Sequence, residues 1–241
     1  MKNFKTAFLL LTLMSVSFTS CLDSDSDYQP SYVAFVTISE SIYGGTQLKS
    51  DFGNYSIQPT NTLASAGLEG AKRALINYYI PEGTEITEST TSIPGQLIPG
   101  QCSPIPISRI STRPDTCGTS KITKFRDFST GYYSFPSMWA QSGYVNVSFQ
   151  YSAASAAVID MVQDSIKQDT LFLGLRVNIK NEGQSIGVPF VCFKLPEYYD
   201  LVNEGLLPKN DSIFVSVSAP VDNGSGSAKT EFVRWKTKAN Y

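Results

Sequence analysis

The chain has 241 residues, of which 41% are hydrophobic and 12% aromatic, enough for a substantial core. Its 19 Lys and Arg residues against 21 Asp and Glu give a net charge of −2, which offers no basic footprint for nucleic acid. There is no histidine, which argues against a Ser-His-Asp or Cys-His catalytic centre and against a typical catalytic zinc site.

The first 20 residues have the pattern of a secretory signal peptide. Lys2 and Lys5 precede the apolar run 7–14, and small residues lead to Cys21. The run is too short to span a membrane as a helix. Cleavage before a cysteine is typical of bacterial lipoproteins, so we expect the Cys21 thiol to carry acyl chains that anchor the protein in a membrane. The alternative is an ordinary signal peptide with a chance cysteine.

Residues 21–31 are acidic and polar, with too few apolar residues to form a core, which indicates a solvated tether. The tract Cys-Leu-Asp-Ser-Asp-Ser-Asp is similar to the acidic segment of surface-exposed lipoproteins in one phylum of Gram-negative anaerobes. We therefore expect a lipid-anchored protein of the outer membrane that faces the cell surface. The periplasmic face is the alternative.

The first half after the tether contains several predicted strands. They cover residues 31–39, 52–58, 72–80 and 104–111. Residues 63–70 suit a helical turn, and the Thr-, Ser- and Pro-rich segment 84–100 suits a loop. In an oxidising compartment, Cys102 and Cys117 could form a disulfide, with two unpaired thiols as the alternative. Cys192 suits a small buried residue. Three scattered cysteines do not indicate a metal site, and no cofactor is expected.

The second half alternates more clearly. In 144–151, Val145, Val147 and Phe149 share one face, as expected of a half-buried strand. Further strands are predicted at 170–179, 187–195, 212–217 and 230–236, while 153–164 suits a helix or a strand and 196–206 a short helix. Short strands separated by turns define an all-β protein.

Four segments resemble the NigD-like lipoprotein family: 20–23, 70–78, 143–147 and 173–178. The resemblance implies an N-terminal OB-like barrel, assigned to residues 32–125, and a C-terminal Ig-like β-sandwich, assigned to residues 126–241. It implies no catalytic residues. Family members often carry a histidine where Val177 stands and another ahead of the strand that holds Ile159, so any function of those imidazoles is absent.

Aromatic residues gather in and after the basic segment 121–139, which we interpret as the domain junction. One hypothesis is a stacking platform for a sugar or peptide, and the favoured alternative is packing between two domains. The predicted platform consists of Tyr132, Tyr133, Trp139 and Tyr144.

Taken together, these features favour a non-enzymatic binding or adhesion module for a protein or glycan partner, attached to the membrane through Cys21. One alternative is an enzyme that uses two carboxylates to cleave a polysaccharide. The other is a structural or secretion-linked accessory of the envelope.

Overall fold

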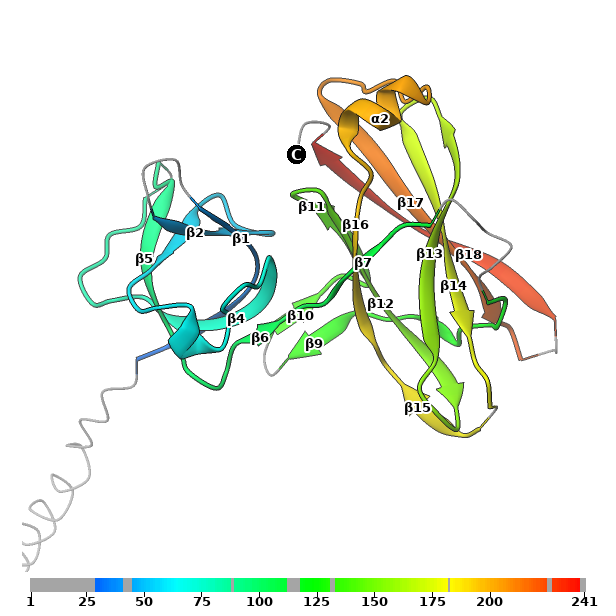
Figure 1. The fold of residues 1–241 in the computed structure, drawn as a ribbon, viewed down its shortest axis with the longest axis horizontal. Helices are drawn as coiled ribbons and strands as arrows, with labels where there is room; N and C mark the ends of the chain where they lie inside the picture. Colours follow the sequence, from blue (N-terminus) through cyan, green and yellow to red (C-terminus); the bar gives the residue numbers. More distant parts are fainter. Residues whose placement is uncertain are drawn as a thin grey trace, which may run out of the picture. The chain divides into compact units, whose positions relative to one another are not determined.

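The computed structural model describes residues 29–40, 45–87, 89–111, 118–130, 133–181, 183–224 and 227–238. Residues from Tyr32 onward form one compact unit. Almost every element is a strand, which confirms the all-β prediction (Figure 1). Among the residues that the structure describes, no helix is long and apolar enough to cross a membrane.

The first part of this unit is a closed β-barrel. Its strands are hydrogen-bonded in the order β1-β2-β3-β5-β4, and β4 pairs back with β1 to close the ring. The pair β3–β5 is parallel, and a short 3-10 helix, η1, lies between β3 and β4. This arrangement is OB-like, as predicted. The elements are β1 (Ser31–Glu40), β2 (Thr46–Ser50), β3 (Ser56–Pro59), η1 (Ala64–Ala66), β4 (Arg73–Tyr79), β5 (Ser92–Leu97) and β6 (Ser103–Pro104), which adds to β4.

The barrel interior is filled by every second residue of its strands. Ala34, Val36 and Ile38 of β1 are buried inside, as the period of a strand requires. Phe35 alternates to the outside of the barrel, yet it is only 1% exposed. Its ring is covered by aromatic residues of the second part of the unit, such as Trp139. The outer face of the barrel at Phe35 is therefore buried against the second part of the unit.

The second part is a β-sandwich. One sheet has the order β11-β12-β16-β7, with β8 and β15 also paired to β12, and the other has the order β13-β14-β17-β18. The elements of the sandwich are β7 (Ile107–Arg109), β8 (Lys124–Phe125), β11 (Met138–Gln141), β12 (Tyr144–Ala153), β13 (Val158–Lys167), β14 (Thr170–Asn178), β15 (Ser185–Gly187), β16 (Phe190–Lys194), α2 (Tyr198–Asn203), β17 (Ser212–Asp222) and β18 (Ala228–Lys238). Between β8 and β11, β9 (Phe128–Thr130) and β10 (Tyr133–Phe135) pair with each other as a separate two-stranded sheet.

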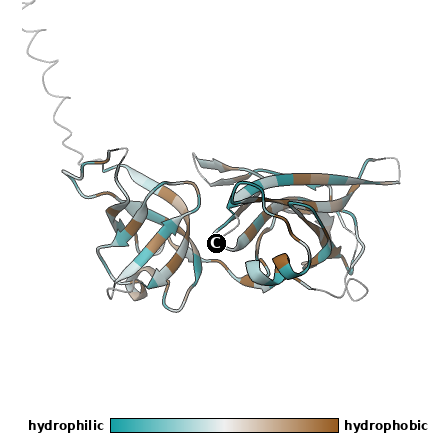
Figure 2. Ribbon diagram, turned by 90° about the horizontal axis from the view of Figure 1, so that it is seen from above, coloured by the Kyte–Doolittle hydropathy of each residue, from teal (hydrophilic) through white to brown (hydrophobic). Residues whose placement is uncertain are grey.

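The sandwich core lies between the two sheets. It receives Val145, Val147 and Phe149 from β12, the residues that the sequence pattern placed on one face. The facing sheet contributes alternate residues of β14 and β17, including Leu173 and Val217. Figure 2 shows hydrophobic and hydrophilic positions following one another along strands of the fold. Burial of these side chains is the main stabilising contribution of the sandwich.

Two expectations from the sequence are corrected by the strand pairing. The segment 84–100, expected to be a loop, contains β5, a barrel strand whose Ile93 and Leu97 are buried. Pro94 and Gly95 are residue types typical of loops, so the sequence of this segment does not indicate a strand. Gly95 is required there, because a Cβ atom at this position would collide with the side chain of Ile57.

The second correction concerns the boundary between barrel and sandwich, expected at 125/126. The predicted strand 104–111 is divided: β6 pairs with β4 of the barrel, and β7 pairs in parallel with β16 of the sandwich. Ile122 is fully buried in the sandwich core. The chain therefore leaves the barrel near residue 106.

Candidate functional site

A buried ion pair forms the centre of a polar network in the barrel. Asp51 directly follows β2, and Arg73 begins β4. The guanidinium donates two hydrogen bonds to the carboxylate, from Nη1 to Oδ1 (2.7 Å) and from Nη2 to Oδ2 (2.5 Å). Nη1 also donates to Thr37 Oγ1 at 2.9 Å. Both charged side chains are 0% exposed. Such a paired arrangement is the usual way to bury two charges.

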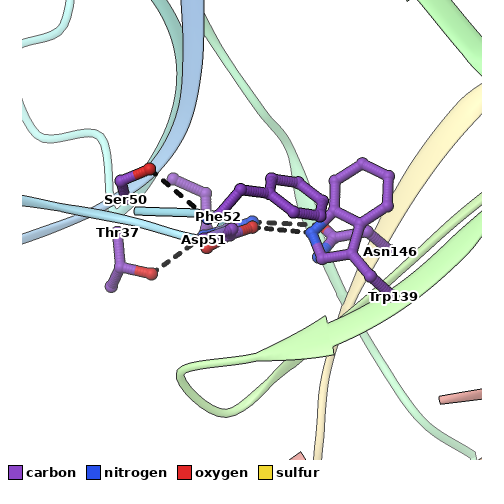
Figure 3. A network of polar contacts seen from close by, with 7 residues as sticks. Thr37, Ser50, Asp51, Phe52, Trp139 and Asn146 are labelled. Atoms are coloured by element: carbon purple, nitrogen blue, oxygen red, sulfur yellow. Dashed lines mark hydrogen bonds and ion pairs between the residues drawn. The ribbon is translucent and has the colours of Figure 1, made fainter. Parts of the chain in front are cut away.

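The sandwich completes this network (Figure 3). The indole Nε1 of Trp139, on β11, donates to Asp51 Oδ2 at 2.7 Å. Asn146, on β12, accepts a hydrogen bond from Arg73 Nη2 at 3.2 Å. The Tyr144 ring faces the Arg73 guanidinium, with 5.1 Å from Cζ to the ring centroid. Barrel and sandwich therefore share one set of hydrogen bonds and a cation–π contact.

The electrostatics of this network favour the charged form of Arg73. Burial alone lowers the pKa of Arg73, but the hydrogen bond and charge of Asp51 outweigh it, so the pKa is raised above its ordinary value. Burial raises the pKa of the Cys192 thiol to about 11, although the Arg73 charge opposes this shift. The thiol is therefore neutral at physiological pH and is not an activated nucleophile.

Aromatic rings surround the network. Phe35 contacts Phe135 with ring centroids 4.7 Å apart and Phe190 at 4.8 Å. Trp139 stacks on Phe190 at 5.5 Å. These distances fall in the range of favourable aromatic pairs. The rings cover the ion pair, whose side chains are 0% exposed, so the Asp51 carboxylate is not accessible to a substrate. Because the rings come from both parts, the arrangement joins the barrel to the sandwich.

The predicted aromatic platform is not assembled as an open surface by the described residues. Trp139 is 0% exposed and offers no ring face to a ligand. Tyr133 and Tyr144 are half-buried, and Tyr144 lies against Arg73. Tyr132 lies outside the described residues. The surroundings of Trp139 match the alternative, packing between two parts of the chain.

The structure describes only two of the four cysteines, Cys102 and Cys192. Cys21 and Cys117 lie outside the described residues. Cys102 Sγ lies 3.5 Å from the carbonyl oxygens of Asn77 and Ile98. The Cys102–Cys117 disulfide and the acylation of Cys21 therefore stay predictions. Among the residues that are described, no three His, Cys, Asp or Glu side chains are grouped to hold a metal ion.

A hollow of about 230 Å³ lies on the barrel wall over β1, β2 and β3. Its lining includes the side chains of Gln47, Lys49, Asn54, Tyr55 and Ser56. These side chains supply amide, ammonium and hydroxyl groups beside one aromatic ring. OB folds use the corresponding strands to bind oligonucleotides or oligosaccharides. The sequence did not predict this hollow, because its residues come together only when β2 pairs with β3.

Comparison with known proteins gives the fold and no family. No family model matches the chain, and no curated protein matches it. A solved structure from Bacteroides fragilis, described as a candidate lipoprotein, has 14% identity and a TM-score of 0.57, covering 88% of this chain and 99% of that one. A candidate toxin-related protein from Parabacteroides distasonis has 19% identity and a TM-score of 0.54, covering 85% and 93%. An uncharacterised protein from Parabacteroides merdae has 12% identity and a TM-score of 0.56, covering 87% and 100%.

Proposed function

We propose that the chain is a lipid-anchored envelope protein with a non-enzymatic binding role. Two observations support the anchor: the signal pattern that ends at Cys21 and the description of a structural neighbour as a candidate lipoprotein. The acidic tract after Cys21 supports an outer-membrane location facing the cell surface. In this proposal the tether holds the barrel and sandwich away from the lipid.

The observation that carries the binding role is the polar hollow on β1–β3. Lys49, Gln47 and Asn54 offer several hydrogen-bond donors and acceptors close to the Tyr55 ring. Convergent polar groups next to a ring suit the hydroxyl groups and flat faces of a sugar. A protein loop with polar side chains could use the same groups. We favour a glycan over a protein loop, because a hollow of about 230 Å³ accommodates a sugar ring more readily than a loop.

The anchor is tested by growing cells with an alkyne analogue of palmitate and detecting label on the full-length chain. We expect label on the wild type and none on Cys21→Ser. The matched control is Cys192→Ser, which removes a buried thiol and is expected to stay labelled. Label that persists on Cys21→Ser, or a wild type released unlabelled into the medium, would contradict the anchor.

The binding role is tested on a glycan array with the chain from residue 22 onward. Lys49→Ala and Asn54→Ala are expected to weaken binding, whereas Lys72→Ala, an exposed lysine outside the hollow, is the matched control. If no glycan binds, or if the three variants bind equally, the assignment to the hollow is wrong. Release of reducing sugar from a bound glycan would contradict the non-enzymatic role.

A further inference from the structure

Strand β18 presents an exposed row of aromatic and basic side chains. Along Ala228–Lys238 the residues alternate, so that Val233 and Trp235 pack inward while Phe232, Arg234 and Lys236 are exposed on the opposite face. Phe232 is 62% exposed. A single exposed ring is common on protein surfaces, so the feature of interest here is the ring together with the basic side chains that follow it on the same face.

Small residues lie next to Phe232 on the neighbouring strands. Phe232 lies opposite Ser218 of β17, which in turn lies beside Gly174 of β14. Ser216, which pairs with Arg234, is only 5% exposed. The Phe232 ring therefore has a short side chain, Ser218, as its direct neighbour on β17, while the Arg176–Asp164 ion pair lies over Gly174 further across the sheet.

Arg234 is held in a fixed position on this face. Its Cζ atom lies 3.8 Å from the centroid of the Phe214 ring, and Nη2 donates to Thr170 Oγ1 at 3.0 Å. Asp169 Oδ1 is 4.0 Å from the same nitrogen. Even so, 53% of the Arg234 side chain is exposed. The guanidinium is therefore preorganised and still has donors that face solvent.

The charge of this face differs from that of the whole chain. The chain has a net charge of −2, whereas the outward-facing residues of β18 include three basic residues, Arg234, Lys236 and Lys238, and no acidic residue. Within the described part of the chain, Lys236 and Lys238 form no ion pair with a carboxylate. A cationic row of this kind attracts an anionic partner.

We propose that the outer face of β17 and β18 binds an acidic polysaccharide, a site separate from the barrel hollow. A sugar ring stacks on Phe232, and its carboxylate or sulfate groups bind Arg234 and Lys236, which follow at intervals of roughly 6.8 Å along the strand. A peptide strand added to the β18 edge fits less well, because β11 lies against β18.

The test uses polygalacturonate as the carboxylate polymer, chondroitin sulfate as the sulfated polymer, and neutral dextran and polyglutamate as the comparison ligands. Binding to the chain from residue 22 is measured by affinity electrophoresis. We expect retardation by at least one acidic polysaccharide that decreases with salt, because the attraction is screened. Dextran and polyglutamate are expected to have little effect.

Two matched pairs of variants locate the site. Lys236→Ser is compared with Lys229→Ser, which removes the same charge from the same strand but from the inward-facing side. Phe232→Ala is compared with Ile186→Ala, since both side chains are more than 60% exposed. We expect Lys236→Ser and Phe232→Ala each to weaken binding roughly threefold to tenfold and the two controls to leave it unchanged.

Three results would overturn the proposal. These are no retardation by either acidic polysaccharide, stronger retardation by polyglutamate, and equal losses for Lys236→Ser and Lys229→Ser. Variants of the barrel hollow, such as Lys49→Ala, are expected to leave this binding intact. Failure of the sandwich site is therefore distinguishable from failure of the barrel site.

Discussion

Arg73 and Arg234 are both in contact with aromatic rings and a carboxylate, but their surroundings give them different roles. Arg73 is 0% exposed, donates two hydrogen bonds to Asp51, and lies between barrel and sandwich. Arg234 is 53% exposed, and its nearest carboxylate, on Asp169, is 4.0 Å away. The same residue type thus joins two parts of the fold in one place and is open to a ligand in the other.

We infer that solvent exposure and the closeness of the counter-charge distinguish an arginine that stabilises the fold from one that can bind a ligand. A buried guanidinium whose partner is removed becomes an uncompensated charge in a medium of low dielectric constant. An exposed guanidinium whose partner is removed is still solvated by water. The predictions below rest on this contrast.

The largest effect is expected from Asp51→Asn. It leaves Arg73 buried without its counter-charge, and it also weakens the acceptor for Trp139. We expect the free energy of unfolding to fall by about 3–5 kcal/mol. Urea denaturation of the chain from residue 22 onward measures the change.

The matched control is Asp169→Asn, beside Arg234, for which we expect a loss below about 1 kcal/mol. The double variant Asp51→Leu/Arg73→Met should recover most of the stability, because no charge is then left buried. Equal losses for Asp51→Asn and Asp169→Asn would contradict the contrast.

A smaller loss is expected from Trp139→Phe. The phenyl ring keeps much of the packing but cannot donate the 2.7 Å hydrogen bond to Asp51. A hydrogen bond to a charged group contributes about 2 kcal/mol, and we expect a loss of this order by chemical denaturation. Trp235→Phe is the control, since Trp235 is partly buried and its indole donates no hydrogen bond to the residues that the structure describes. A larger loss at Trp235 would argue against the network.

The pH dependence of stability tests the buried thiol of the network. The unfolded Cys192 thiol ionises near pH 9, whereas in the folded state it stays protonated until about pH 11. The native state then binds more protons, so this contribution to stability is present below pH 9 and is lost as the pH rises to 11. The loss should be on the order of 2 kcal/mol.

Cys192→Ala should show a shallower decline in the free energy of unfolding between pH 9 and pH 11 than the wild type. Burial also raises the pKa of Tyr78, so both proteins keep that share of the slope. Identical slopes would show that the Cys192 thiol ionises at its ordinary pH in the fold.

The smallest stability effect is expected from Arg234→Ala, below about 1 kcal/mol, because the side chain is largely solvated. In the same variant we expect binding of the acidic polysaccharide to be lost. A stability loss as large as that of Asp51→Asn would place Arg234 among the structural arginines.

Much of the fold could be predicted from the sequence. The alternation at Val145, Val147 and Phe149 gave strand β12 and its buried face, because periodicity within one strand is a local property. β5 could not be predicted in this way, since Pro94 and Gly95 suggest a loop and only the contact with Ile57 explains the glycine. The boundary near residue 106 was also missed, because β7 pairs with β16 far along the chain.

Less of the site could be predicted. Trp139 was singled out as an aromatic residue at a junction, and its interior position follows from contacts with Phe35 more than 100 positions earlier. The pairing of Asp51 with Arg73 could not be predicted, because nothing local indicates that two charged residues 22 positions apart form a buried pair. The exposure of Phe232 likewise depends on which strands lie beside β18.

The central claim is that the Asp51 network makes barrel and sandwich one cooperative unit. Native-state hydrogen exchange at Ile57 of the barrel and Leu173 of the sandwich, as urea is increased, tests it directly. We predict that the protection of both amides converges on one global free energy of unfolding, and that Asp51→Asn lowers both values equally. Separate unfolding of the two parts, with Asp51→Asn lowering only the barrel value, would contradict the claim.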